Sequence, residues 1–278
     1  MEQKVIFFDI DGTLIDFGGE FPESAKEALQ KAKDNGHKIF ICSGRSKCQI
    51  EKRLLDFGFD GYVCAAGAYV EYEGNVIFEH HLTSTQLDKL FSFFNENNII
   101  YMLQCTDRVI STRACFEEMF DNFKKRMKGD MPKNISKIFE SQEIDDNIAA
   151  NTAQYKNAEK VCYYKAGFTY DKVNELIGSE FDVTAMSFKS ERDASGEITV
   201  AGVTKALGMR KLIEFLGKTR EETVAFGDGP NDFEMLEYAG IGVAMGNASD
   251  DLKAIANIIT TNIGDNGIFN GLKKLGLI

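Results

Sequence analysis

The chain has 278 residues, of which 44% are hydrophobic and 27% are charged. This composition is typical of a globular protein with a buried core, and it excludes a wholly disordered chain. The net charge of −11 disfavours nonspecific binding to nucleic acid or to an anionic membrane, because the long-range field repels both.

The first part of the chain alternates strand and helix patterns. Val5–Ile10 is a nearly continuous apolar run, which indicates a strand buried on both faces. Pro22 to Asn35 has apolar residues at helical spacing and is followed by Gly36, which predicts a helix. The further predictions in this part are a strand over Lys38–Cys42, a helix over Ser46–Phe57, a strand over Tyr62–Ala66 and a hairpin over Ala68–Leu82.

From Thr83 to Lys189 the order of the patterns is mixed. Helices are predicted over Ser84–Asn97, Cys115–Met127 and Tyr170–Leu176, and strands over Ile99–Gln104, Val161–Lys165 and Val183–Phe188. From Val203 the alternation of strand and helix patterns seen in the first part of the chain returns. Its predicted elements are helices over Thr204–Leu216, Asp232–Tyr238 and Ser249–Ala256, and strands over Thr223–Phe226, Ile241–Ala244 and Ile258–Thr260.

This order predicts an α/β protein with a doubly wound, Rossmann-like parallel sheet and a second, α+β domain inserted in its middle. Ser43 and Lys205, which both border elements of the predicted core, are 162 positions apart. One further strand–helix–strand unit needs only about 30 to 40 residues, so enough chain is left for a domain. We expect the core to comprise residues 1–82 and 190–278, and the inserted domain residues 83–189.

The cysteines and the N-terminal segment indicate in which cellular compartment the protein is expected. Six cysteines occur without a CxxC spacing, and we interpret them as reduced thiols. No apolar stretch approaches 18 residues, and the segment 1–12 lacks the profile of a signal peptide. We therefore expect a cytoplasmic protein that binds neither membrane nor nucleic acid; monomer and dimer both stay open.

Polar clusters fall where the predicted core strands end, the edge at which open α/β sheets bind ligands. These are Asp9, Asp11 and Thr13 after the first strand, Ser43 and Gly44 after the second, and Asp228, Asn231 and Asp232 after the strand over 223–226, with Lys205 at the start of a helix. Carboxylates that share one site repel each other unless a cation intervenes. Oxygen ligands without His or Cys favour a hard divalent ion, and we expect Mg²⁺. Together with phosphate donors from Ser43, Lys205 and backbone amides, this describes a phosphoryl-transfer site.

The same segments resemble the motifs of the haloacid dehalogenase (HAD) superfamily. Asp9-Ile10-Asp11-Gly12-Thr13-Leu14 is similar to its motif I, Ser43-Gly44-Arg45 to motif II, Lys205 to the lysine of motif III, and Gly227-Asp228-Gly229-Pro230-Asn231-Asp232 to motif IV. Gly242 to Ala248 resembles the Cof-type branch, whose members carry a large C2 cap between motifs II and III. The resemblance covers nearly the whole chain, although the middle matches only in size and position.

The resemblance implies a mechanism residue by residue. Asp9 is then the nucleophile that forms an aspartyl-phosphate, and Asp11 the general acid and base. Phosphate binding falls to Gly12, Ser43, Gly44, Lys205 and Asn231. The Mg²⁺ site is implied to include the Asp9 and Asp228 carboxylates and the Asp11 backbone carbonyl, with Asp232 acting through water. Asp11 favours phosphate ester hydrolysis over dehalogenation.

The expected activity is hydrolysis of small phosphorylated metabolites, with sugar phosphates as the leading class. Flavin mononucleotide and pyridoxal phosphate come next, and the residues that choose among them cannot be identified from the sequence. Two alternatives stay open. One is phosphotransfer to a sugar hydroxyl, as in a mutase, and the other is a regulator that binds a metabolite without catalysis. The regulator predicts a damaged motif, whereas Asp9, Asp11, Ser43, Lys205 and Asp228 are all present.

Overall fold

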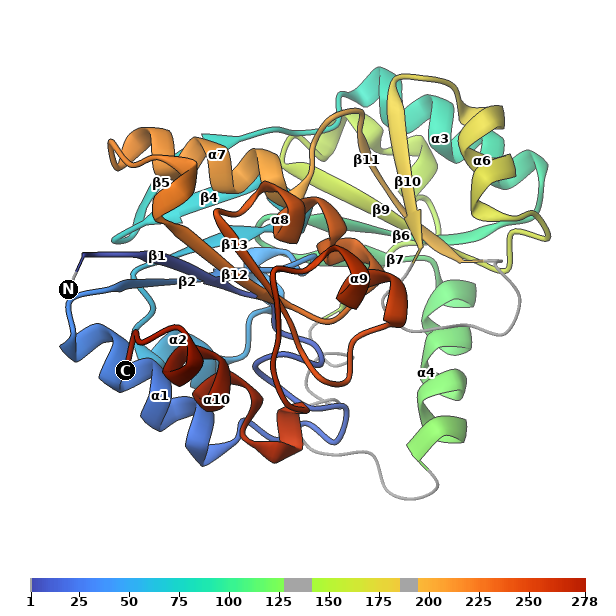
Figure 1. The fold of residues 1–278 in the computed structure, drawn as a ribbon. Coiled ribbons are helices and arrows are strands. Elements are labelled where there is room, and N and C mark those ends of the chain that lie inside the picture. The colour runs from blue at the N-terminus through green and yellow to red at the C-terminus, as the bar shows by residue number, and fades with distance from the viewer. Residues whose placement is uncertain (1, 128–141, 186–194) are drawn as a thin grey trace. The chain divides into compact units, whose positions relative to one another are not determined.

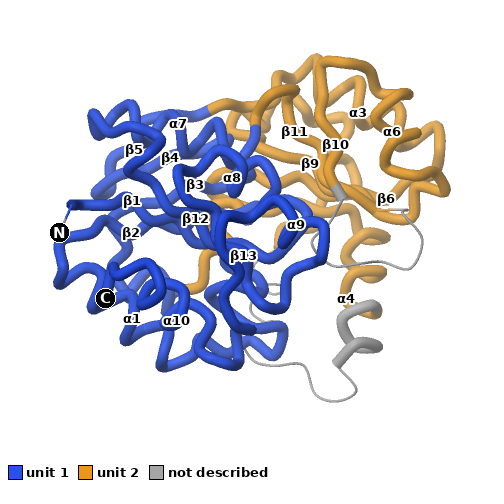
Figure 2. The backbone as a smooth tube through the Cα atoms, viewed as in Figure 1, with its two compact units in different colours: residues 1–45, 52–79, 204–278 blue, residues 46–51, 80–203 orange. Residues whose placement is uncertain are grey.

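The computed structural model describes residues 2–127, 142–185 and 195–278, and these form two compact units (Figures 1 and 2). The first unit comprises residues 1–45, 52–79 and 204–278, and the second comprises residues 46–51 and 80–203. The predicted boundary at residue 189 and the end of the predicted strand over Val183–Phe188 lie outside the described residues.

The first unit is built on an eight-stranded sheet of order β14-β13-β12-β1-β2-β3-β4-β5. Its strands are β1 (Val5–Phe8), β2 (Lys38–Cys42), β3 (Gly61–Cys64), β4 (Tyr69–Tyr72), β5 (Asn75–Glu79), β12 (Thr223–Gly227), β13 (Ile241–Ala244) and β14 (Ile258–Ile259). The six strands from β14 to β3 run parallel, and β4 and β5 form the predicted hairpin. The predicted α/β fold with a parallel sheet is thus confirmed.

Helices cover both faces of this sheet (Figure 1). They are α1 (Glu23–Asp34), α2 (Lys52–Phe57), α7 (Lys205–Phe215), α8 (Phe233–Tyr238), α9 (Asp250–Ile255) and α10 (Gly267–Lys274). Val5 and Phe7 of β1 share a buried cluster with Met209 of α7 and Leu236 of α8. The side chains of Ile6 and Phe8 alternate to the opposite face. Because β1 is fully buried, its end lies deep in the unit.

The second unit has a six-stranded sheet of order β10-β11-β9-β6-β7-β8, in which only β7 and β8 pair in parallel. Its elements are α3 (Ser84–Glu96), β6 (Ile100–Cys105), β7 (Val109–Ser111), α4 (Arg113–Met127), β8 (Gln142–Ile144), β9 (Ala158–Tyr164), α6 (Tyr170–Ile177), β10 (Phe181–Ala185) and β11 (Gly196–Val200). Leu90 and Phe94 of α3 pack with Leu103, Tyr163 and Val173 in its core. None of the described helices in either unit is long and apolar enough to cross a membrane.

Three details differ from the sequence predictions. Residues 190–203 were assigned to the core, but β11 pairs with β9 and β10 and therefore belongs to the second unit. The predicted helix over Ser46–Phe57 is broken into a 3₁₀ turn and α2, because the backbone of Ile50 is extended. The strands β7, β8 and β11 and the helix α10 were not predicted.

Candidate active site

Three polar residues follow neighbouring strands of the first unit directly. Asp9 follows β1, Ser43 follows β2, and Asp228 follows β12. Since β1 pairs in parallel with both β2 and β12, the three residues emerge at one edge of the sheet. A hydrogen bond from the Asp9 backbone N to the Phe226 carbonyl, at 3.0 Å, keeps β1 and β12 together up to this edge.

The ammonium group of Lys205 lies between two buried carboxylates. Its Nζ donates to Asp9 Oδ1 and to Asp232 Oδ1, each at 2.6 Å. Lys205 is 2% exposed, Asp9 4% and Asp232 0%. Lys205 is the first residue of α7, and Thr204 caps that helix by accepting a hydrogen bond from the Leu207 backbone N. The cap fixes where the helix begins and therefore where its first side chain lies.

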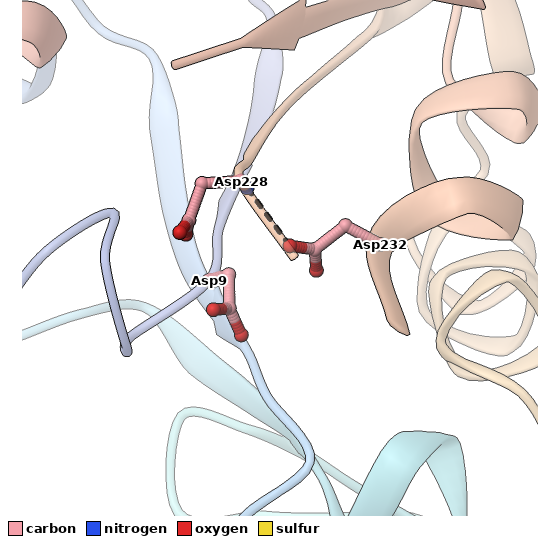
Figure 3. Close-up of side chains that lie close together, drawn as sticks. All are labelled: Asp9, Asp228 and Asp232. Carbon is pink, nitrogen blue, oxygen red and sulfur yellow. Dashed lines mark hydrogen bonds between the residues drawn. The ribbon is translucent and has the colours of Figure 1, made fainter. Parts of the chain in front are cut away.

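Asp232 also organises the loop after β12. Its Oδ2 accepts hydrogen bonds from the backbone N–H groups of Asp228 and Gly229, both at 2.9 Å. Figure 3 shows the first of these contacts, with the carboxylates of Asp9, Asp228 and Asp232 gathered at the ends of β1 and β12. Both oxygens of Asp232 are thus engaged by protein donors, and the carboxylate ties α7 to this loop.

Asp228 receives one hydrogen bond on each oxygen. Thr13 Oγ1 donates to its Oδ1 at 2.8 Å, and Asn247 Nδ2 donates to its Oδ2 at 3.2 Å. Gly12 has a positive φ of +87°, and a Cβ atom built on it would lie 2.1 Å from Asp228 Oδ2. Only glycine allows both this backbone conformation and this close approach.

Burial and nearby negative charge both disfavour the ionised carboxylates of Asp9 and Asp228. Burial, followed by the nearby Asp232, raises the pKa of Asp9 well above its ordinary value, although Lys205 acts against this. Burial and Asp232 likewise raise the pKa of Asp228 to about 7. Burial lowers the pKa of Lys205, but the carboxylates of Asp232 and Asp9 outweigh it and leave the pKa raised. One ammonium group therefore does not offset the negative charge of the cluster.

The donor set fits a hard cation. One carboxylate oxygen from each of Asp9, Asp228 and Asp232 lies within 4.8 Å of the others, and all three residues are buried. Oxygen ligands of this kind suit Mg²⁺ or Ca²⁺ rather than zinc or copper. A divalent ion would also offset the burial of charge and the repulsion that together raise the pKa of Asp9 and Asp228.

The side chain of Asp11 is not part of this three-carboxylate group. Its two oxygens accept hydrogen bonds from Arg45, from Nε at 3.0 Å and from Nη2 at 2.6 Å. The pair is partly exposed, with side-chain exposures of 22% for Asp11 and 18% for Arg45. The two-point contact fixes the plane of the Asp11 carboxylate at the rim of the site.

The remaining predicted residues lie in the loops of the same edge. Ser43 is buried, and its Oγ accepts a hydrogen bond from the Arg45 backbone N at 3.2 Å, with Gly44 between them. Asn231 is in the 3₁₀ turn Pro230–Asp232, and its buried Oδ1 has no hydrogen-bond partner among the described residues. Such an orphaned acceptor is costly unless it binds a ligand or water.

Sequence reasoning assigned no role to Arg45 or Asn247 and left that of Thr13 open. Arg45 and Asn247 lie inside segments that resemble family motifs, and this position was the one sequence feature that pointed to a role for them. Arg45 contacts Asp11 across 34 positions, and Asn247 Nδ2 also donates to the Gly12 carbonyl oxygen across 235 positions, so no local pattern could have revealed these contacts.

Comparison with known proteins identifies the class of enzyme. The family model of haloacid dehalogenase-like hydrolases matches residues 6–272, and the chain belongs to this family. YkrA of Bacillus subtilis (strain 168) is 31% identical over 280 residues, with 100% of each chain covered.

Two further relatives narrow the class. Pyridoxal phosphate phosphatase YbhA of Escherichia coli (strain K12) is 28% identical over 274 residues, which cover 96% of this chain and 95% of the relative. The solved structure of the HAD subclass IIB sugar phosphatase BT4131 has a TM-score of 0.79 and 26% identity, with 99% of this chain and 100% of that chain covered. The chain is therefore a phosphatase of the HAD superfamily.

Proposed function

We propose that this phosphatase hydrolyses small phosphorylated metabolites, with sugar phosphates as the preferred class, in a Mg²⁺-dependent reaction through an aspartyl-phosphate on Asp9. The observation that carries the proposal is the buried Asp9 carboxylate, held by Lys205 beside Asp228 and Asp232 at the end of β1. A carboxylate fixed at this position can attack phosphorus and divide one displacement into two easier ones.

Lys205 positions the nucleophile. Its ammonium group holds Asp9 Oδ1, and it is itself held by Asp232, so the carboxylate of Asp9 cannot rotate freely. The positive charge also favours the approach of a phosphate dianion to a site that is otherwise acidic. The hydroxyl of Ser43 and the backbone amides of the loop after β1 supply donors to the phosphoryl oxygens, as does Gly44 next to Ser43.

Asp9 and Asp228 would hold the Mg²⁺ ion, which supplies charge neutralisation for the phosphoryl oxygens. Asp232 acts indirectly in this proposal, because its oxygens already accept three hydrogen bonds from Lys205, Asp228 and Gly229. The backbone carbonyl of Asp11 and the orphaned Oδ1 of Asn231 remain candidate ligands for the ion or its water. The second unit is the proposed inserted domain, and we assign to it the choice among leaving groups.

Asp11 is the proposed acid and base, and Arg45 holds it until substrate arrives. An acid must present a carboxyl oxygen to the leaving oxygen, whereas both oxygens of Asp11 are engaged by the guanidinium group of Arg45. The contact must therefore open during the cycle. A substrate phosphate is a strong competing partner for the guanidinium group.

Asp11→Asn is expected to slow both half-reactions by roughly 10²–10⁴-fold, because neither the leaving alkoxide nor the attacking water is then served by a proton-transferring group. Rapid-quench measurement of alcohol release and phosphate release reports the two steps separately. Asp16→Asn, a change in the exposed loop that follows, is the matched control. A variant with wild-type rates in both steps would remove Asp11 from this role.

The function itself is tested by phosphate release from a panel of sugar phosphates, nucleotides, flavin mononucleotide and pyridoxal phosphate. We expect release in Mg²⁺ and less than about 1% of it in EDTA, because Asp9 and Asp228 then face each other without a cation. Sugar phosphates should rank highest in kcat/KM. Release that survives EDTA would contradict the metal dependence, and a different leading class would contradict the substrate preference.

A further inference from the structure

Asn247 has no assigned role, yet its side chain joins three segments of the first unit. It lies in the loop after β13, within Gly246-Asn247-Ala248. Its Nδ2 donates to the Gly12 carbonyl oxygen at 2.9 Å and to Asp228 Oδ2 at 3.2 Å. Its Oδ1 accepts a hydrogen bond from the Ile263 backbone N at 3.0 Å. Both ends of the amide are thus used.

The backbone around Asn247 is held firmly enough to aim the side chain. The Met245 backbone N donates to the Gly227 carbonyl at 3.0 Å, which ties the loop to the residue before Asp228. The Gly246 backbone N donates to the Thr261 carbonyl at 3.0 Å, and a Cβ atom on Gly246 would lie 2.5 Å from the Asn262 backbone N. The loop therefore has little freedom to move away from Asp228.

Two side chains donate hydrogen bonds to Asp228, one from a residue before it in the chain and one from a residue after it, and each donates to a different carboxylate oxygen. Thr13 holds Oδ1 and Asn247 holds Oδ2, so rotation of the carboxylate would break at least one hydrogen bond. Each oxygen keeps a further lone pair for another partner. The same amide nitrogen of Asn247 donates to the Gly12 carbonyl oxygen. This contact links the loop after β1 to the carboxylate of Asp228, which Gly12 approaches closely.

We propose that Asn247 is a positioning residue that sets the orientation of Asp228 and so prepares it to hold the divalent cation. The inference rests on the proposed function, because it assumes that Asp228 is a ligand. Asparagine is suited to this position since one amide supplies donors to two oxygens and an acceptor to Ile263. Aspartate would keep the acceptor, lose the donors and place a further negative charge next to Asp228.

The test is the binding of Mg²⁺ alone to substrate-free protein, measured by titration calorimetry, together with thermal melting. We expect Asn247→Ala to weaken Mg²⁺ binding by about 10-fold, the usual lower range for loss of a group that orients a metal ligand. Asn257→Ala is the matched control. The Asn257 side chain also holds a backbone N–H, that of Gly242 at 2.7 Å, but it contacts none of the aspartates.

The outcomes separate this inference from the proposed function. Wild-type protein that binds no Mg²⁺ would overturn the proposed metal site. Wild-type protein that binds Mg²⁺ while Asn247→Ala binds it equally well would overturn the role of Asn247 alone. Weaker binding in Asn257→Ala as well would show a general loop effect and would also overturn it. Raised Mg²⁺ should restore kcat of Asn247→Ala, since the chemistry of Asp9 and Asp11 is untouched.

Asn247→Asp covers the case in which the alanine variant does not fold. It keeps the acceptor for the Ile263 backbone N–H and removes the donors to Gly12 and Asp228. The variant therefore tests the contact with Asp228 separately from the contact that holds the loop. We expect the metal-free variant to have a lower melting temperature than wild type, because two carboxylates then face each other. Saturating Mg²⁺ should reduce this difference in melting temperature. A metal-free melting temperature equal to that of wild type would contradict the contact with Asp228.

Discussion

Asp9→Asn is expected to lower phosphatase turnover below about 1% of wild type, because the nucleophile is lost and no other described carboxylate replaces it at the end of β1. The fold should persist. Lys205 keeps Asp232 as its ion partner, and removal of one of three buried negative charges relieves repulsion. Steady-state phosphate release and thermal melting are the measurements.

Two comparisons make this result specific. Asp34→Asn changes the same residue type at the end of α1, where its side chain accepts a hydrogen bond from Gln30, and turnover should stay at the wild-type level. Asp9→Ala cannot regain a carboxylate by deamidation, so its residual rate sets the true background. Turnover well above 1% in Asp9→Ala, with native melting, would show that the phosphoryl group is not transferred to Asp9.

Lys205→Met is expected to cause the largest loss of stability, about 3–5 kcal/mol at neutral pH, because it leaves Asp9 and Asp232 buried without their shared cation. Methionine is close to lysine in length and apolar, so packing is largely kept. Urea unfolding at pH 7.5, in the absence of metal, measures the free energy of unfolding.

The pH dependence of this loss has a defined sign. The pKa of Asp9 in the folded protein lies above its unfolded value, so ionisation of this carboxyl opposes folding. The deficit of Lys205→Met should therefore shrink as the pH falls and Asp9 takes up a proton. Lys211→Met is the control on the same helix, where the lysine is 39% exposed and pairs with Glu214 at 3.9 Å. It should change stability by less than about 0.5 kcal/mol. An equal loss in both variants would contradict the buried cation between two carboxylates.

The core strands were predictable because each is bounded by clear signals. β2 and β13 have the predicted limits. The apolar run of β2 ends at the polar Ser43, and the run that contains β13 ends one residue after the strand, before Gly246-Asn247. In contrast, α10 contains Gly267 and Gly271 and has weak helix propensity. The structure explains the second glycine, because a Cβ atom on Gly271 would lie 2.6 Å from the Phe226 ring. Packing against the sheet, rather than local preference, makes this helix.

The boundary of the second unit was misjudged for a related reason. The sequence of β11 has no local feature that assigns it to the second unit, which precedes it in the chain, rather than to the first unit, which follows it. Its membership follows from hydrogen bonds to β9 and β10, which no periodicity reports. Likewise, β8 is three residues long, and its pairing with β7 joins residues that are remote in the chain, such as Val109 and Gln142. A hydrogen bond from Ser111 Oγ to Gln142 Oε1 at 2.9 Å accompanies this pairing.

The sequence by itself determined the α/β rhythm, the residues that follow the core strands and the family, because strand periodicity, turn residues and motif spacing are properties of neighbouring positions. Only the tertiary structure decided that Lys205 joins Asp9 to Asp232, that Arg45 holds Asp11, and that Thr13 and Asn247 hold Asp228. These contacts bridge up to 215 positions and depend on strand order β13-β12-β1-β2. Side chains that are remote in the chain meet only because parallel strands bring their carboxyl ends to one edge.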